Sequence, residues 1–433
     1  MSRRPSASGP ARSWDGPGSP LSVAFLLYRG NPRCGGQGVY ARHLTRELAA
    51  LGHDVTVVAG RPYPDLEDGV RLVRLPSLDL YRDGDPFRRP RLRELGEPAD
   101  LLEVATMHLG GFAEPRTFSL RARAALAARA GQFHLVHDDQ CLGTGLLGLQ
   151  ADGWPLLASI HHPVTVDRAV DLAHAPNLGR RLALRRWYGF AAMQTRVARR
   201  LDRVLTVSEA ARDDVVREHG VDPDRIAVVP VGVDTDVYRP APAVGRIPGR
   251  IMTTASSDVP LKGVLPLLEA IAKARVERPE IHLVVIGRPR PDGPVAAAIE
   301  RLGLEGAVEL VSGEPDAAIA RRYAEAACAV VPSLYEGFSL PAVEALACGT
   351  PLVATTGGAL PEVVGDDGVH ARLVPPGDPS ALAAALLQLL DDPALAARLA
   401  AAGGARVRQR FSWSATARAT VVEYERLLAG RPC

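Results

Sequence analysis

Apolar runs of four to eight residues alternate with stretches of helical spacing along most of this chain. The runs at 21–28 and 328–331 are typical: branched apolar residues dominate them, and proline or small residues follow. Such runs favour strands that are buried on both faces of a parallel sheet. The repeated change from strand to helix therefore predicts an α/β protein built from doubly wound parallel sheets.

The predicted strands form two groups. In the first half of the chain they lie at 21–28, 54–59, 70–75, 133–137, 156–160, 204–207 and 226–229. In the second half they lie at 250–255, 282–286, 308–311, 328–331 and 352–354. A proline-rich segment separates the two groups, which indicates a linker between two Rossmann-like domains with a cleft between them.

A chain of 433 residues exceeds the length at which one core stops growing, so two domains are expected on size as well. The start of the chain is rich in Ser, Pro, Gly and Arg, which favours disorder. We expect a disordered lead-in at 1–20, a first domain at 21–235, a linker at 236–248, a second domain at 249–411 and a terminal helix within 412–433.

The composition of the chain excludes some classes of function but does not identify one. The 51 basic and 49 acidic side chains give a net charge of +2, which offers no general reason to expect nucleic acid as a partner. The five cysteines are scattered and lack metal-ligand spacing, which fits a reduced cytoplasm. No apolar run approaches the 18 residues of a membrane span.

The most informative segment is the one that follows the predicted strand at 328–331. It places two carboxylates, Glu336 and Glu344, eight positions apart across the start of one predicted helix. Glu336 falls in the loop between strand and helix, at the strand end where open α/β sheets bind ligands. Glu344 falls on the apolar stripe of the helix, where a carboxylate needs a partner.

The same segment has the features of an anion site. Gly337, Phe338 and Ser339 place backbone N–H groups at a helix N-terminus, Ser339 can cap the helix, and Pro341 suits its first turn. Carboxylates beside a bound anion would repel it unless they hold its hydroxyl groups. The pattern therefore favours a phosphorylated, hydroxyl-rich ligand such as a nucleotide sugar, with an ordinary glutamate at the edge of an amphipathic face as the alternative for either residue.

With these residues in place, the chain resembles the family 4 glycosyltransferases, retaining enzymes of the GT-B fold, over about 21–425. The resemblance implies that Glu336 holds hydroxyls of the donor sugar and that Glu344 holds the ribose. It implies that the backbone of Phe338 to Leu340 meets the diphosphate. It also implies an acceptor site in the first domain, a terminal helix that crosses back to that domain, and no required metal or cofactor.

Two further positions follow strands in the first half. Gly35 and Gly36 open the helix after the first strand, without the spacing of a dinucleotide motif, and the family resemblance assigns them to the diphosphate and the transferred sugar. A tight turn is the structural alternative. His161 follows the fifth strand and matches the family histidine that contacts the donor sugar better than His162 does; a satisfied polar group is its alternative.

The second half supplies cations. Lys262 matches a family lysine that offsets charge on the leaving diphosphate. The family arginine about five residues earlier is missing, and Ser256 and Ser257 stand in that region. Arg288, which follows the strand at 282–286, is our predicted replacement, with Arg290 second and a solvated loop arginine as the alternative.

An arginine-rich stretch at 179–203 carries eight arginines and one aspartate, interleaved with aromatic residues. Helical spacing of Leu184, Trp187, Phe190 and Val197 can form a basic amphipathic face for anionic lipid. The alternative is a solvated helix whose apolar stripe belongs to the core. Lipid contact would make a cytoplasmic protein peripheral at the inner membrane face.

The sequence thus predicts a retaining, metal-independent glycosyltransferase that moves a sugar from a nucleoside diphosphate sugar to a hydroxyl acceptor. UDP is favoured by its frequency in the family. Two alternatives remain: a GT-B epimerase or phosphorylase, and a non-catalytic protein that binds nucleotide sugars. The donor sugar, the acceptor and the oligomeric state are left open.

Overall fold

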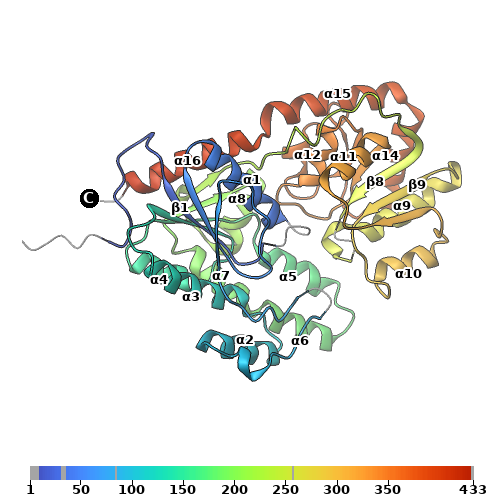
Figure 1. Cartoon of the computed structure of the whole chain (residues 1–433). Helices are drawn as coiled ribbons and strands as arrows, with labels where there is room; N and C mark the ends of the chain where they lie inside the picture. Colours follow the sequence, from blue (N-terminus) through green and yellow to red (C-terminus); the bar gives the residue numbers. More distant parts are fainter. Residues whose placement is uncertain (1–8, 31–35, 83–84, 256–257, 431–433) are drawn as a thin grey trace, which may run out of the picture. The chain divides into compact units, whose positions relative to one another are not determined.

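The computed structural model describes residues 9–30, 36–82, 85–255 and 258–430 (Figure 1). These residues separate into two compact units. Unit 1 takes the described residues within Met1–Val207, Arg212–Val229 and Ser414–Cys433, and unit 2 takes Ser208–Ala211 and those within Pro230–Trp413.

Unit 1 contains a seven-stranded sheet whose strands all run parallel, in the order β3-β2-β1-β4-β5-β6-β7. Its central strand, β4, has no exposed position, because helices cover both faces. The strands are β1 (Ser22–Leu27), β2 (Asp54–Ala59), β3 (Arg71–Arg74), β4 (Leu135–Asp139), β5 (Leu156–Ser159), β6 (Arg203–Thr206) and β7 (Ile226–Val228).

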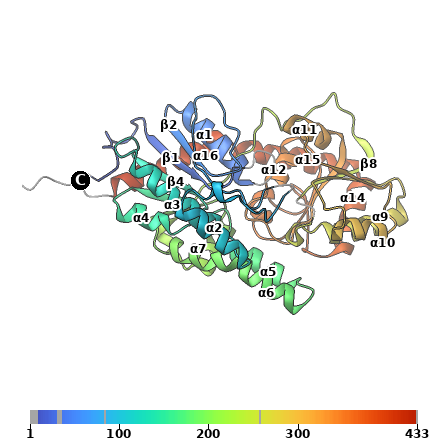
Figure 2. The ribbon, with the colours of Figure 1, turned by 60° about the horizontal axis from the view of Figure 1, so that its bottom comes forward.

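The helices of unit 1 follow these strands in a right-handed doubly wound pattern. They are α1 (Gly36–Ala50), α2 (Pro98–His108), α3 (Glu114–Ala127), α4 (Gly145–Ala151), α5 (Val164–Ala173), α6 (Leu178–Trp187), α7 (Ala191–Ala198), α8 (Glu209–Asp214), which joins the two units, and α16 (Trp413–Ala429). Both views show α6 lying well away from the sheet (Figures 1 and 2).

Unit 2 contains a six-stranded parallel sheet in the order β10-β9-β8-β11-β12-β13. The strands are β8 (Ile247–Thr254), β9 (His282–Ile286), β10 (Val308–Val311), β11 (Ala326–Val331), β12 (Leu352–Thr355) and β13 (Arg372–Val374). The helices are α9 (Val264–Glu277), α10 (Pro294–Arg301), α11 (Asp316–Glu325), α12 (Leu340–Ala347), α13 (Leu360–Val364), α14 (Pro379–Asp391) and α15 (Pro393–Arg410). The two doubly wound α/β units confirm the predicted fold class.

Predicted strand positions agree best where the apolar run is sharply bounded. β2, β9 and β10 have the expected ends, whereas β4 begins two residues later than expected and includes the carboxylates of Asp138 and Asp139. Apolar pattern cannot reveal strand residues that are polar and buried. β13 was not predicted at all, because it has only three residues at a sheet edge and two of them are only partly buried.

Two segments expected to lie outside the domains are packed against them. The described part of the lead-in lies on unit 1, where the backbone N–H of Arg12 donates to the carbonyl of Phe133 at 2.7 Å. The expected linker 236–248 lies within unit 2, and its Tyr238 is buried against Tyr323. Prolines made the segment resemble a linker, but its aromatic ring and Arg246 attach it to the unit.

The terminal helix α16 belongs to unit 1 by its contacts. The Tyr424 hydroxyl lies 2.6 Å from Nδ1 of His137 on β4, and the Arg203 Nε donates to Glu423 at 2.7 Å. Burial lowers the pKa of His137 to about 3, so this imidazole is neutral and serves as a link between sheet and helix.

The arginine-rich stretch does not form the continuous lipid-facing helix that its spacing predicted. It forms α6 and α7, joined by a short turn at Tyr188–Phe190. Leu184 and Val197 are buried, and Trp187 packs against Phe112 with ring centroids 5.1 Å apart. Two residues of the stripe are therefore core and the other two are half-buried, and lipid contact stays a prediction.

No single helix within the described residues is long and apolar enough to cross a membrane. The pair α14 and α15 passes by length and composition when taken together, but it is bent by 103°.

Candidate functional site

The loop after β11 is held by its own side chains. The Ser333 hydroxyl donates to Oε1 of Glu336 at 2.7 Å, and the backbone N–H of Leu334 donates to the carbonyl of Leu261 at 2.8 Å. The second bond joins this loop to the one that carries Lys262. Two predicted site loops that lie far apart in sequence are therefore fastened together at the carboxyl ends of β8 and β11.

An ion pair forms where these loops meet. The Lys262 ammonium lies 2.9 Å and 3.1 Å from the two carboxylate oxygens of Glu336, which is buried. Gly263 makes the approach feasible: its φ is +64°, and an added Cβ would lie 2.0 Å from the carbonyl oxygen of Pro332. The two residues predicted to act on diphosphate and sugar are thus in direct contact.

The start of α12 differs from the prediction at Ser339. This residue stands at the N-cap position, but its φ is +90° and its side chain does not cap the helix. Its hydroxyl oxygen is buried and has no hydrogen-bond partner among the described residues. The positive φ marks a strained turn at the start of the helix, and the serine does not act as the predicted cap.

The rest of this turn is firmly anchored. The carbonyl of Gly337 accepts a hydrogen bond from the Ser208 hydroxyl at 2.6 Å, and Phe338 is buried edge-on against Phe411 at 5.3 Å. Pro341 lies in the first turn, as predicted. Leu340 begins α12, and the first N–H groups of a helix have no intrahelical acceptor, so they remain available for an anion.

Glu344 lies on α12 with the partial burial that its helical position predicted, but its carboxylate has no hydrogen bond or ion pair with any described residue. Burial, reinforced by the charge of Asp316, raises the pKa of this carboxyl to about 8. The partner that the sequence required for Glu344 is therefore not supplied by the described chain. Ribose hydroxyls, which the family resemblance places here, would supply it.

The two candidate arginines after β9 have different surroundings. Arg288 is exposed and makes no hydrogen bond or ion pair with a described residue. Arg290 is occupied by Asp258, whose Oδ2 accepts from the Arg290 backbone N–H at 2.6 Å and from its Nε at 3.4 Å. This difference favours Arg288. The serines at 256 and 257, where the family arginine is missing, lie outside the described residues.

In unit 1, His161 is fixed on three sides. Its Nε2 lies 2.7 Å from Oδ1 of Asp139, and its backbone N–H donates to Oε1 of Gln140 at 2.7 Å. The ring of Tyr40 meets it edge-on at 4.6 Å. His162 is paired instead with Asp167, at 2.9 Å. The structure thus gives the preferred histidine the more buried and more constrained position.

Asp139 is the functional candidate that the sequence did not reveal. Neighbouring residues of a strand point to opposite faces, so the sequence alone does not place this carboxylate beside His161. Asp139 ends β4 and pairs in register with Ser159 of β5, two residues before His161. The adjacency of these strand ends was the signal that could have identified it. Burial raises the pKa of Asp139, and His161 opposes that shift.

The glycine loop is only partly described. Gly35 lies outside the described residues, and Gly36 is the exposed first residue of α1. A Cβ added at Gly36 would meet no atom within 4 Å, so the protein itself does not require glycine there. Close approach of a ligand remains the prediction for this position. Within the described residues, no group of three or more His, Cys, Asp or Glu side chains is placed to hold a metal ion.

Comparison with known proteins identifies the family. Residues 34–237 match the model of Glycosyltransferase Family 4, and residues 248–392 match that of Glycosyl transferases group 1. An MMP alpha-(1->4)-mannosyltransferase of Mycolicibacterium hassiacum is 51% identical over 410 residues, which cover 94% of this chain and 99% of the relative. The chain belongs to glycosyltransferase family 4.

Other members are more distant. A D-inositol 3-phosphate glycosyltransferase of Kineococcus radiotolerans is 31% identical over 442 residues, with 94% of each chain covered. Among solved structures, the sucrose-phosphate synthase of Thermosynechococcus elongatus aligns with a TM-score of 0.70 at 24% identity, covering 95% of this chain and 100% of that one. Anabaena HepE, solved with UDP and glucose, gives 0.67 at 18% identity, with 93% and 99% covered. These likenesses confirm the GT-B fold, and the family assigns glycosyltransferase activity.

Proposed function

We propose that this glycosyltransferase moves a mannosyl unit from a nucleoside diphosphate sugar to a hydroxyl acceptor, with retention of the anomeric configuration. The contact between Lys262 and Glu336 carries the proposal, because it joins a cation to a buried carboxylate beside the unpartnered Ser339 hydroxyl. A leaving diphosphate needs a cation, and sugar hydroxyls need an acceptor. The mannosyltransferase relative at 51% identity supports the choice of sugar.

In the proposed reaction, the acceptor oxygen bonds to the anomeric carbon while the bond from that carbon to the phosphate oxygen breaks. The departing phosphate oxygen takes the acceptor proton on the same face, so no protein nucleophile and no covalent intermediate are involved. Lys262 and Arg288 offset the charge that develops on the nucleoside diphosphate. Glu336 holds sugar hydroxyls, and Glu344 holds the ribose.

His161 is proposed to contact the donor sugar, the role that the family resemblance assigns. Asp139 would act as a positioning residue: its carboxylate fixes the orientation of the imidazole, whose Nε2 it contacts, and Nδ1 remains for a ligand. The backbone bond from His161 to Gln140 restricts the ring further. A histidine held in this way contributes a hydrogen bond without losing side-chain entropy at the moment of binding.

A donor panel tests this function. UDP-linked and GDP-linked mannose and glucose would each be incubated with mannoside and inositol phosphate acceptors, and release of nucleoside diphosphate would be followed with and without acceptor. Because UDP and GDP are each linked to the same two sugars, the panel decides the nucleotide and the sugar separately. UDP is the nucleotide that is favoured by its frequency in the family. We expect acceptor-dependent release with mannose, and a product whose anomeric configuration, measured by NMR, matches the donor.

The same panel can contradict the proposal. Binding without turnover across all donors would indicate a nucleotide-sugar-binding protein, and turnover that needs no acceptor would indicate an epimerase. Inversion in the product would remove the proposed same-face proton transfer. Activity should also survive chelation, because Lys262 and Arg288 are the proposed counter-charges; loss in EDTA that magnesium or manganese restores would overturn that part.

Peripheral contact with anionic lipid is proposed for α6, now through residues other than the predicted stripe. Leu178 and Leu182 are 75% and 55% exposed on this helix. Four exposed arginines accompany them without a described ion-pair partner: Arg180, Arg181, Arg185 and Arg186. A cytoplasmic location at the inner membrane face goes with this proposal. Vesicles that contain anionic lipid should bind the protein at low salt and release it as salt rises; lack of binding at low salt would favour a soluble acceptor.

A further inference from the structure

A pocket in unit 2 lies apart from the residues assigned to the donor. Its volume is about 560 Å³, within the range of small-molecule sites. It is lined where strands begin: Gly249 on β8, Ala327 on β11, and Pro351 before β12. The donor residues follow the other ends of these parallel strands. The pocket therefore lies at the amino ends of the strands of this sheet, and the donor residues lie at their carboxyl ends.

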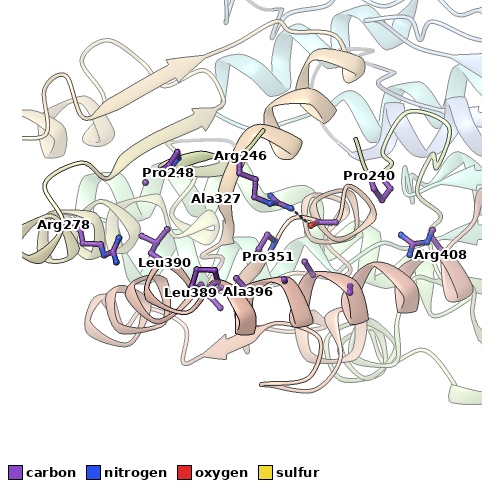
Figure 3. A pocket seen from close by; sticks show the side chains of 16 residues that line it. Pro240, Arg246, Pro248, Arg278, Ala327, Pro351, Leu389, Leu390, Ala396 and Arg408 are labelled. Atoms are coloured by element: carbon purple, nitrogen blue, oxygen red, sulfur yellow. Dashed lines mark hydrogen bonds between the residues drawn. The ribbon is translucent and has the colours of Figure 1, made fainter. Parts of the chain in front are cut away.

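Most of the pocket wall is apolar. Leu389 and Leu390 come from α14, and Ala396, Ala397 and Ala401 come from α15 (Figure 3). Small side chains on α15 leave the space open, since alanine adds little bulk to the helix surface. No acidic side chain is among the described residues that line the pocket.

Three arginines give this apolar pocket a positive charge. In the view of Figure 3, Arg278 and Arg408 lie at opposite ends and Arg246 lies between them. Arg278 is neutralised by ion pairs with Glu280 and Asp391. The other two have no carboxylate partner in the described chain.

Their hydrogen bonds differ. The guanidinium of Arg246 donates to two carbonyl oxygens, those of Ala326 at 2.6 Å and Gly349 at 2.5 Å. These bonds fix the side chain at the pocket wall but leave its charge uncompensated. Arg408 is exposed and makes no hydrogen bond or ion pair with a described residue. One cation is thus held in place while the other can close on a ligand.

We propose that this pocket binds a small amphipathic anion: an oxyanion headgroup at the unpaired Arg408, with the charge of Arg246 further along the same pocket, joined to an apolar body that lies against α14 and α15. A guanidinium group can donate two parallel hydrogen bonds to either a carboxylate or a phosphate, so both headgroups would bind in the same way. The alkyl part is bound by removal of apolar surface from water. This site goes beyond the proposed transfer reaction, and its occupant does not compete with the nucleotide.

Calorimetric titration of the full-length protein with octanoate, octyl phosphate and 1-octanol tests the proposal. We expect saturable 1:1 binding of at least one anion, about tenfold tighter than binding of the neutral alcohol. The same affinity should be found with UDP or GDP present. Equal affinity for octanoate, octyl phosphate and octanol, or competition with the nucleotide, would overturn it.

Two helix variants locate the site. Ala401→Leu should fill the pocket and weaken anion binding about tenfold, whereas Ala405→Leu, also exposed on α15 but outside the pocket, should not. Leucine is a good helix former, so both variants should keep the melting temperature. Arg408→Gln should lower affinity for the anions but not for octanol. Identical binding by the two leucine variants would place the ligand elsewhere.

Discussion

The candidate residues of unit 1 and those of unit 2 are prepared for a ligand in different ways. His161 in unit 1 already has its protein partners, a buried carboxylate and a side-chain amide. The second oxygen of that carboxylate, Oδ2 of Asp139, has no partner among the described residues. In unit 2, Lys262 and Glu336 satisfy each other, the buried Ser339 hydroxyl has no described partner, and the partly buried Glu344 carboxylate forms no ion pair with a described residue.

We propose that a ligand binds at the groups that lack a protein partner. Buried polar groups without partners cost stability, and they persist where function requires them. A nucleotide sugar would supply phosphate oxygens for the Ser339 turn and ribose hydroxyls for Glu344. His161 in unit 1 is already oriented by its protein partners, whereas Ser339 and Glu344 in unit 2 would gain partners from the donor.

The largest effect is expected from Glu336→Gln. Its carboxylate should hold the sugar more strongly as positive charge develops, so turnover should fall on the order of 100-fold while the KM for the donor changes little. Glu314→Gln is the matched control, because Glu314 is also ion-paired in unit 2, with Arg322 at 2.7 Å. Steady-state kinetics give the answer; a fall in both variants would point to general charge effects.

Arg288→Ala should come next. Loss of a charged hydrogen bond to the diphosphate should weaken nucleoside diphosphate binding by roughly 1.5 to 3 kcal/mol. Arg290→Ala should have less effect, since Asp258 occupies that side chain. Calorimetric affinities for UDP and GDP test the difference. Unchanged affinity in the Arg288 variant, with the fold intact, would remove this residue from the site.

Asp139→Asn tests unit 1. Misorientation of His161 should lower kcat about 10- to 100-fold. Asp167→Asn offers a close control, because it changes the equivalent pairing of His162. Nitrogen NMR of the imidazoles separates positioning from plain structural damage: the tautomer of His161 should change in the first variant only. A normal His161 tautomer together with normal turnover would show that Asp139 does not position the ring.

The sequence predicted features whose residues are close together in the chain better than features whose residues are far apart in it. Glu336 and Glu344 were found because they belong to one contiguous motif with helical spacing. The contact of Asp139 with His161 was not predicted, because it depends on the register of two parallel strands whose ends are 20 residues apart. The unpaired hydroxyl of Ser339 was likewise missed, because residue type favours a cap and only the backbone geometry shows that no capping bond forms.

A separate prediction concerns the pH dependence of stability rather than activity. The pKa of Glu344 is raised to about 8 from 4.5, so the folded state binds an extra proton between these values. Its contribution to stability is complete below pH 4.5 and is lost as pH rises toward 8, with a slope of at most about 1.4 kcal/mol per pH unit. Glu344→Gln should flatten the pH dependence of urea unfolding, and the exposed Glu305→Gln should not. Parallel curves for the wild type and Glu344→Gln would contradict the raised pKa.

The central claim is that Glu336 binds the sugar and Glu344 binds the nucleotide. The affinity for nucleoside diphosphate alone tests this claim most directly. UDP and GDP would be titrated into the wild type, Glu336→Gln and Glu344→Gln. Glu344→Gln should weaken binding because an amide donor replaces one of the two carboxyl oxygens offered to the ribose hydroxyls, whereas Glu336→Gln should bind as tightly as the wild type or more tightly, since Lys262 is freed for the diphosphate. Equal weakening in both variants, or none in Glu344→Gln, would contradict the assignment of one carboxylate to the sugar and the other to the nucleotide.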